Sequence, residues 1–146
     1  MVGELAFTPA WDLAKMIQRK EVSPVELVDV LLERISYLNP KLNAYLTVCQ
    51  DEAKSAAKEA ERKVMKGEKL PPLHGVPISV KDLIFTKGIR STGGSLIHKD
   101  FIPVEDAVAV ERLRRAGAII LGKTNTPELG QSATTYCCIV KMKGLM

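Results

Sequence analysis

The stretch that decides the fold runs from residue 73 to residue 82 and reads Leu73-His-Gly-Val-Pro-Ile-Ser-Val-Lys-Asp82. Its apolar part, Val76–Val80, lies between turn residues and a charged pair, which is typical of a short strand. Downstream, residues 106–116 show helical spacing, and Ala118–Leu121 are all apolar, as in a fully buried strand. A strand, a connection, a helix and a second strand in this order predict two parallel strands joined by a crossover.

The preceding part of the chain predicts three helices, over residues 8–19, 23–39 and about 51–66. Thr8-Pro9 has the pattern of an N-cap followed by proline at the first helical position. Ser23 is expected to cap the second helix, with Glu26 closing a capping box. Asn39-Pro40 is expected to end this helix, because the residue before a proline is pushed out of the α region. Leu42–Val48 then fit a short connector or an edge strand.

These patterns together predict an α/β fold in which N-terminal helices precede part of a mixed or parallel sheet with flanking helices. Only two convincing sheet strands are predicted, whereas a parallel sheet is covered on both faces and usually has more strands. We therefore expect the chain to form one side of a larger α/β domain.

Composition and charge narrow the classes of function. The net charge of +4 results from 21 basic and 17 acidic residues, and the basic clusters have no interleaved aromatic residues. A nucleic-acid surface usually has a basic stripe with stacking aromatics, so we predict no direct nucleic-acid binding. No apolar run approaches the roughly 20 residues that cross a bilayer, and no secretory signal precedes the first helix. The sequence therefore predicts a cytoplasmic protein without a membrane anchor.

Cysteines and histidines do not form the pattern of a metal or cofactor site. Cys49 and the adjacent Cys137-Cys138 do not make the two pairs of a zinc site. His74 and His98 are far apart and lack companions, so we expect each to have a packing or loop role. We predict no metal and no cofactor.

Residues 117–124, Gly-Ala-Ile-Ile-Leu-Gly-Lys-Thr, match the phosphate-binding P-loop pattern letter for letter. A P-loop follows a strand and leads into a helix, whereas here a helix comes first and Ala118–Leu121 are themselves the strand. The backbone amides of this strand would bond to neighbouring strands and not to phosphate. We therefore reject nucleotide binding.

Lys81 is the candidate catalytic residue. It directly follows an apolar strand, and α/β folds place their ligands at the carboxyl ends of parallel strands. Burial in such a place disfavours the charged form of a lysine, and a neutral amine can act as a general base for a hydroxyl nucleophile. On the spacing alone, a solvent-exposed lysine is the commoner case, because lysine is seldom buried.

Several blocks of the sequence, in the same order, resemble the amidase signature family. They are Leu73–Asp82, Thr86–Arg90, Ser91–Ser95, Asp106–Leu113, Ala116–Asn125 and Pro127–Leu129. The similarity runs from about residue 8 to about residue 131. The family includes aliphatic amidases and the A subunit of glutamyl-tRNA(Gln) amidotransferase, so the resemblance implies hydrolysis of amide carbon–nitrogen bonds in small-molecule substrates.

The resemblance also implies a Ser–cis-Ser–Lys triad, in which Lys81 matches the lysine. Both serines of the family belong to a Gly/Ser-rich segment that this sequence lacks. We assign residues 1–135 to the N-terminal part of an amidase domain and residues 136–146 to a divergent tail that suggests a premature stop or frameshift. We therefore expect the chain to be inactive alone.

Two further interpretations remain open at this stage. The chain is either a binding module that pairs with a partner chain carrying the serines, or a remnant without function. The unfinished sheet favours pairing, with a separate chain or in a homo-oligomer, because an open strand edge can accept another strand.

Overall fold

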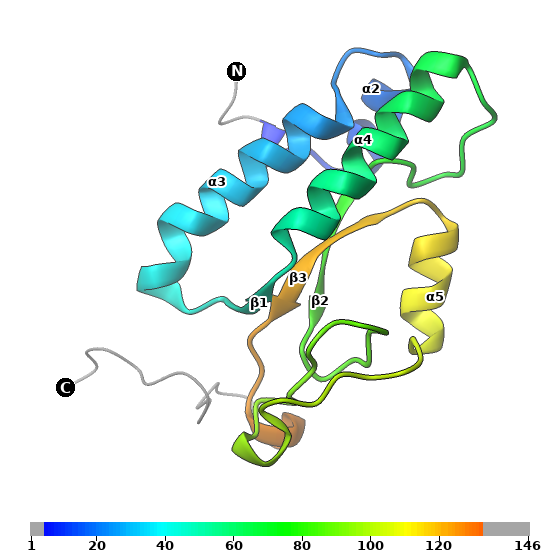
Figure 1. The fold of residues 1–146 in the computed structure, drawn as a ribbon. Helices are drawn as coiled ribbons and strands as arrows, with labels where there is room; N and C mark the ends of the chain where they lie inside the picture. Colours follow the sequence, from blue (N-terminus) through cyan, green and yellow to red (C-terminus); the bar gives the residue numbers. More distant parts are fainter. Residues whose placement is uncertain (1–4, 133–146) are drawn as a thin grey trace.

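The computed structural model describes residues 5–132, and the predicted tail 136–146 therefore lies outside the described residues. The helices are α2 (Ala10–Gln18), α3 (Pro24–Leu42), α4 (Gln50–Lys66) and α5 (Val108–Arg115), as drawn in Figure 1. The strands are β1 (Tyr45–Val48), β2 (Pro77–Lys81) and β3 (Ile119–Thr124), and two 3-10 turns are η1 (Leu96–His98) and η2 (Glu128–Gly130). Within the described part, no helix is both long and apolar enough to span a membrane.

The sheet has the strand order β1-β3-β2, with β3 parallel to β2 and antiparallel to β1. The predicted α/β class and the parallel pair are confirmed, and the segment after α3 is an edge strand that makes the sheet mixed. Both ladders are irregular near Gly122: the register with β2 shifts between Ile120 and Gly122, and the register with β1 shifts between Lys123 and Thr124. A Cβ at Gly122 would lie 2.2 Å from the carbonyl oxygen of Thr47, so only glycine allows β1 to approach this closely.

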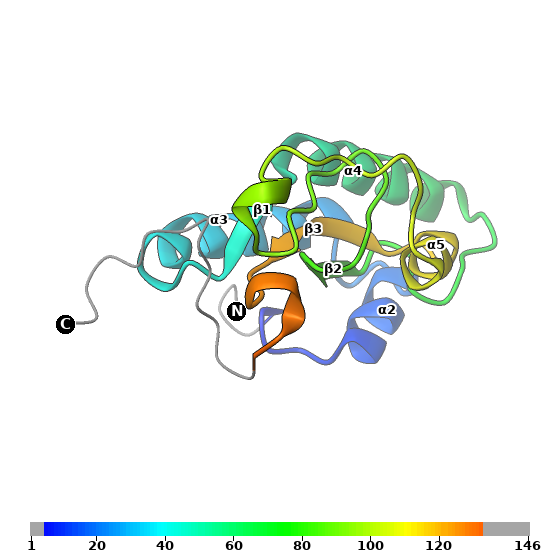
Figure 2. The same cartoon turned by 90° about the horizontal axis from the view of Figure 1, so that it is seen from below.

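Successive side chains of β3 point to opposite faces of the sheet, so they pack against different helices on the two faces. Ile119 and Leu121 pack with α3 and α4 in one buried cluster, whereas Ile120 packs with Val80 of β2 and Val110 of α5. Figures 1 and 2 show α4 on one side of the strands, and α5 beyond β2 on the side away from β1. The alanine face of α4 contributes Ala53, Ala57 and Ala60 to the first cluster.

The second helix does not end at Asn39-Pro40 as predicted, because α3 continues to Leu42. Its end is set by the side chain of Asn39: Nδ2 donates to the carbonyl oxygen of Tyr45 over 3.1 Å, and Oδ1 accepts from the N–H of Tyr45 over 2.7 Å. Asn43 then takes a left-handed conformation, with φ of 51°. Pro40 lies in the last turn and has no N–H, so α3 lacks the hydrogen bond that this residue would otherwise donate.

The predicted helix caps are confirmed only in part. Ser23 caps α3, and its Oγ accepts a hydrogen bond from the N–H of Glu26 over 3.2 Å. The carboxylate that contacts Ser23 belongs to Glu61 of α4 and not to Glu26, so the cap also joins two helices. At the first helix, Pro9 takes the N-cap position that the sequence assigned to Thr8.

Candidate functional site

Lys81 is the last residue of β2, at the carboxyl end of the parallel strand pair, opposite Thr124 of β3. This is the position that the sequence predicted for it. Its side chain is exposed, whereas the predicted role requires a desolvated amine. Within residues 5–132 the structure therefore supplies the location of the candidate base but not the burial that the predicted role requires.

Asp82 follows Lys81 and turns into the protein. Only 1% of it is exposed, and its backbone N–H extends the sheet by donating to the carbonyl oxygen of Thr124 over 2.9 Å. Its Oδ2 accepts from the N–H of Thr92 over 2.9 Å and from Oγ1 of Thr92 over 2.5 Å. Its Oδ1 is buried and has no hydrogen-bond partner among the described residues. In the sequence, Asp82 was recognisable only as half of a charged pair, and nothing there indicated this environment.

Lys123 of β3, the lysine of the rejected P-loop pattern, is fully buried beneath the loop that follows Lys81. Its Nζ donates to the carbonyl oxygen of Ile84 over 2.5 Å, to Oγ1 of Thr86 over 3.1 Å and to Oγ of Ser91 over 2.6 Å. Burial lowers the pKa of the Lys123 amine to about 8, although the nearby carboxylate of Asp82 opposes this shift. Lys123 thus anchors the loop from inside, and its amine does not face a phosphate site.

The far end of the loop is fixed by η2. Oγ of Ser95 donates to Oε1 of Glu128 over 2.7 Å, and the N–H of Leu129 donates to the carbonyl oxygen of Gly93 over 2.8 Å. These contacts hold the glycine-containing part of the loop against the segment that follows β3. The end of β2, the loop and η2 therefore meet at one end of the sheet.

An apolar hollow of about 360 Å³ lies within this loop. It is lined by Leu83, Phe85, Ser91, Thr92, Gly93, His98, Phe101 and Leu129. The rings of Phe85 and Phe101 lie 5.4 Å apart, and 54% of Phe85 is exposed. A concentration of exposed apolar side chains marks a contact surface, so this end of the sheet is suited to contact with further polypeptide or an apolar ligand.

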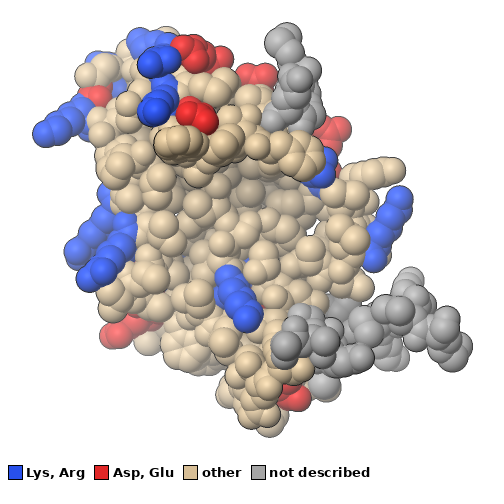
Figure 3. All heavy atoms as spheres, turned by 180° about the vertical axis from the view of Figure 1, so that it is seen from behind, with Lys and Arg blue, Asp and Glu red and all other residues tan. Residues whose placement is uncertain are grey.

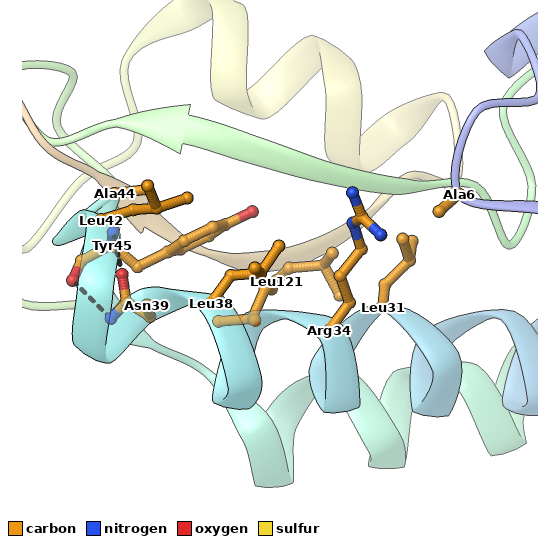
Figure 4. Close-up of a pocket in the computed structure, with 10 residues that line it drawn as sticks. Ala6, Leu31, Arg34, Leu38, Asn39, Leu42, Ala44, Tyr45 and Leu121 are labelled. Carbon is orange, nitrogen blue, oxygen red and sulfur yellow. Dashed lines mark hydrogen bonds between the residues drawn. The ribbon is translucent and has the colours of Figure 1, made fainter. Parts of the chain in front are cut away.

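A second hollow, of about 220 Å³, lies between α3 and the sheet (Figure 4). Its lining is mainly apolar and comprises Ala6, Leu31, Arg34, Ile35, Leu38, Asn39, Leu42, Ala44, Tyr45 and Leu121. The Tyr45 hydroxyl shares a hydrogen bond with the hydroxyl of Ser79. Alternate residues of a strand point to the same face. The side chain of Lys81 therefore extends from the same face of the sheet as those of Ser79 and of Tyr45 in β1.

The histidines of the described chain have no metal-binding companions. His74 is buried, and its Nε2 is 3.0 Å from the carbonyl oxygen of Ala60, which makes it a packing residue between α4 and the turn before β2. His98 is exposed in η1. Over residues 5–132, no three or more His, Cys, Asp or Glu side chains gather in a way that could hold a metal ion.

Comparison with known proteins identifies relatives of the chain. The family model described as Amidase matches residues 26–140. The A subunit of glutamyl-tRNA(Gln) amidotransferase from Geobacter metallireducens is 42% identical over 123 residues, covering 84% of this chain and 25% of the relative. Its counterpart from Geobacillus thermodenitrificans is 44% identical over 124 residues, covering 85% of this chain and 26% of the relative.

Solved structures give the same result. A bacterial aryl acylamidase of the amidase signature family superposes with a TM-score of 0.81 at 32% identity, covering 88% of this chain and 27% of that one. The peptide amidase of Stenotrophomonas maltophilia superposes with a TM-score of 0.76 at 36% identity, covering 83% of this chain and 25% of the amidase. The chain spans about a quarter of the length of these relatives, in agreement with the prediction that it forms one side of a larger domain.

Proposed function

Because the chain belongs to the amidase family, we propose that it supplies the general base of an amide-hydrolysing centre and that Lys81 is this base. The observation that supports the proposal is the position of Lys81, at the carboxyl end of a parallel strand pair inside the matched region. Ligands of open α/β sheets bind at this end.

In the proposed reaction, the neutral amine of Lys81 takes the proton of one serine hydroxyl, which in turn takes the proton of a second serine. The second serine oxygen attacks the amide carbonyl, and backbone N–H groups stabilise the tetrahedral oxyanion. The carbon–nitrogen bond breaks as the amine leaves with a proton, and water then hydrolyses the acyl-enzyme. We infer that both serines come from polypeptide outside the described residues, and that this polypeptide also buries Lys81.

We propose small amides, including the side-chain amide of glutamine, as the substrate class, and the cytoplasm as the location. Two relatives are named as an aryl acylamidase and a peptide amidase, and others as the A subunit of glutamyl-tRNA(Gln) amidotransferase, so amide chemistry is common to their names. Cys49 is a free, buried thiol, which suits a reducing compartment.

A second candidate function is that of a complementation module, which binds a separate polypeptide bearing the serine segment. The sheet supports it, because β2 is an edge strand of the described sheet although it carries the candidate base. The side of the molecule opposite to that of Figure 1 also supports it, since charged side chains lie mainly at its margins (Figure 3). An open edge and a sparsely charged face are suited to further protein.

One experiment tests the base and the module together. The 146-residue chain is mixed with a polypeptide comprising the part of the Geobacter metallireducens relative that follows its matched region, and ammonia release from glutamine and simple amides is measured. We expect activity only in the mixture, and its loss in Lys81→Ala. Lys58→Ala, which removes an exposed lysine of α4, is the matched control.

Two results would contradict this proposal. Activity of the chain alone that depends on Lys81 would disprove the need for external serines. Undiminished activity of the Lys81→Ala mixture would disprove the role of Lys81. A chain without function is expected instead to bind hydrophobic dyes and to show weak near-ultraviolet dichroism, with no binding of the added polypeptide.

A further inference from the structure

Asp82 keeps one carboxylate oxygen without a partner, although the residue is almost completely buried. Its Oδ2 has two donors, both from Thr92, whereas Oδ1 has none among the described residues. Burial of a charged oxygen is unfavourable unless hydrogen bonds replace its hydration. The carboxylate is therefore only half satisfied by this chain.

The buried cation Lys123 does not serve this oxygen. Lys123 is close enough for the charge of Asp82 to affect its amine. A lysine amine has three N–H donors, and those of Lys123 are directed to Ile84, Thr86 and Ser91. The missing donor for Oδ1 must therefore come from elsewhere.

We propose that Asp82 is a positioning residue, whose Oδ1 accepts a hydrogen bond from a backbone N–H or hydroxyl of the serine-bearing polypeptide. The inference rests on the proposed function, because it requires that polypeptide to dock at the carboxyl end of β2. The backbone N–H of Asp82 is fixed to Thr124 at 2.9 Å, immediately after Lys81. A hydrogen bond to Oδ1 would thus hold the incoming segment in register with the base.

η2 is hydrogen-bonded to the loop that contains Thr92, the partner of Asp82. Leu129 of η2 bonds to Gly93, the neighbour of Thr92, and is 48% exposed. Its φ of 49° is a left-handed conformation that is unfavourable for a residue with a β-carbon. In the proposed complex, η2 shifts on docking so that a donor can reach the buried Oδ1.

Asp82→Asn separates this role from a purely structural one. The asparagine oxygen can still accept both hydrogen bonds from Thr92, while its NH₂ replaces the unpartnered Oδ1. In the isolated chain we expect unchanged or higher stability, because a half-satisfied buried charge is removed. In the complex we expect weaker binding, because the NH₂ group of the substituted side chain then faces the N–H or hydroxyl donor of the added polypeptide.

The test compares the wild-type chain, Asp82→Asn and Asp100→Asn, an exposed aspartate as control. The probe is the same Geobacter metallireducens polypeptide, and the readouts are calorimetric binding and urea unfolding of the free chain. We expect Asp82→Asn to weaken binding roughly ten- to a hundredfold. Asp100→Asn should bind as the wild type does.

Three results would overturn the inference: wild-type affinity of Asp82→Asn, a loss of stability of the free Asp82→Asn chain, or no binding by the wild-type chain. A loss of stability would show that the carboxylate serves the fold of this chain. Failure of the proposed function is distinct, since it would appear as a wild-type complex that forms, is weakened by Asp82→Asn, and hydrolyses no amide.

Discussion

Replacing Lys123 with methionine tests how the loop after the candidate base is held. The buried amine is stabilised by its three hydrogen bonds and destabilised by the loss of hydration. A pKa lowered from 10.5 to about 8 corresponds to about 3 kcal/mol against the charged amine in the folded state. Methionine fills a similar volume but has neither the charge nor the donors.

The penalty for burying the charged Lys123 amine depends on pH in a defined direction. At pH 7 the amine is protonated in the folded and unfolded states, so the whole penalty applies. Between pH 8 and 10.5 the unfolded state binds more protons, and the stability of the wild-type chain relative to a variant without the amine rises with pH. At pH 9 about 1.4 kcal/mol of the penalty is relieved.

We expect Lys123→Met to lose about 1–3 kcal/mol of unfolding free energy at pH 7, because lost hydrogen bonds to a charged group exceed the relieved desolvation. The difference from wild type should grow by about 1.4 kcal/mol at pH 9. Urea unfolding followed by far-ultraviolet dichroism at both pH values measures it. Lys58→Met, which changes an exposed lysine, is the control and should show no such change. A difference that stays constant from pH 7 to pH 9 would refute the burial argument.

Two further substitutions test the sheet and the end of α3. Gly122→Ala places a Cβ 2.2 Å from the Thr47 carbonyl oxygen, so we expect a loss of more than about 3 kcal/mol in urea unfolding. Gly67→Ala, where nothing lies within 4 Å of the added carbon, should cost only about 1 kcal/mol; equal losses would contradict the close approach of β1. Asn39→Ala removes both hydrogen bonds to Tyr45 and should lower the free energy of unfolding by about 1–3 kcal/mol. Relative to the wild type, amide hydrogen exchange should become faster in β1 and change less in β2. Unaltered exchange in β1 would show that another contact holds the strand.

Features that depend on neighbouring residues were predictable from the sequence. The Ser23 cap lies within one turn of the groups that it bonds, and the strand predicted at 118–121 from its apolar run is found as the first part of β3. The end of α3 was not predictable, because it depends on Asn39 meeting Tyr45 after the chain turns. A proline rule that considers only the next residue therefore placed that end too early.

The candidate site shows the same division. The family pattern placed Lys81 at the end of a strand, and the strand is present. Nothing in the spacing of Lys123 indicates burial, because its acceptors at positions 84, 86 and 91 become neighbours only when β2 and β3 pair. The half-satisfied carboxylate of Asp82 was equally hidden, since it depends on how the loop returns to Thr92.

The contrast between the two lysines explains why the proposed chemistry needs more polypeptide than the described residues provide. Lys123 is paired across the sheet with Val80, one residue before Lys81, and the fold surrounds its amine with acceptors. Acceptors of this kind stabilise a charged amine and oppose its use as a base. The Lys81 side chain is exposed to solvent instead. In the proposed mechanism, a base at position 81 requires burial with few acceptors, so the polypeptide proposed to supply the serines would also exclude water from this amine. Covering Lys81 and providing its proton donor are thus one event, and binding without burial of Lys81 should give no turnover.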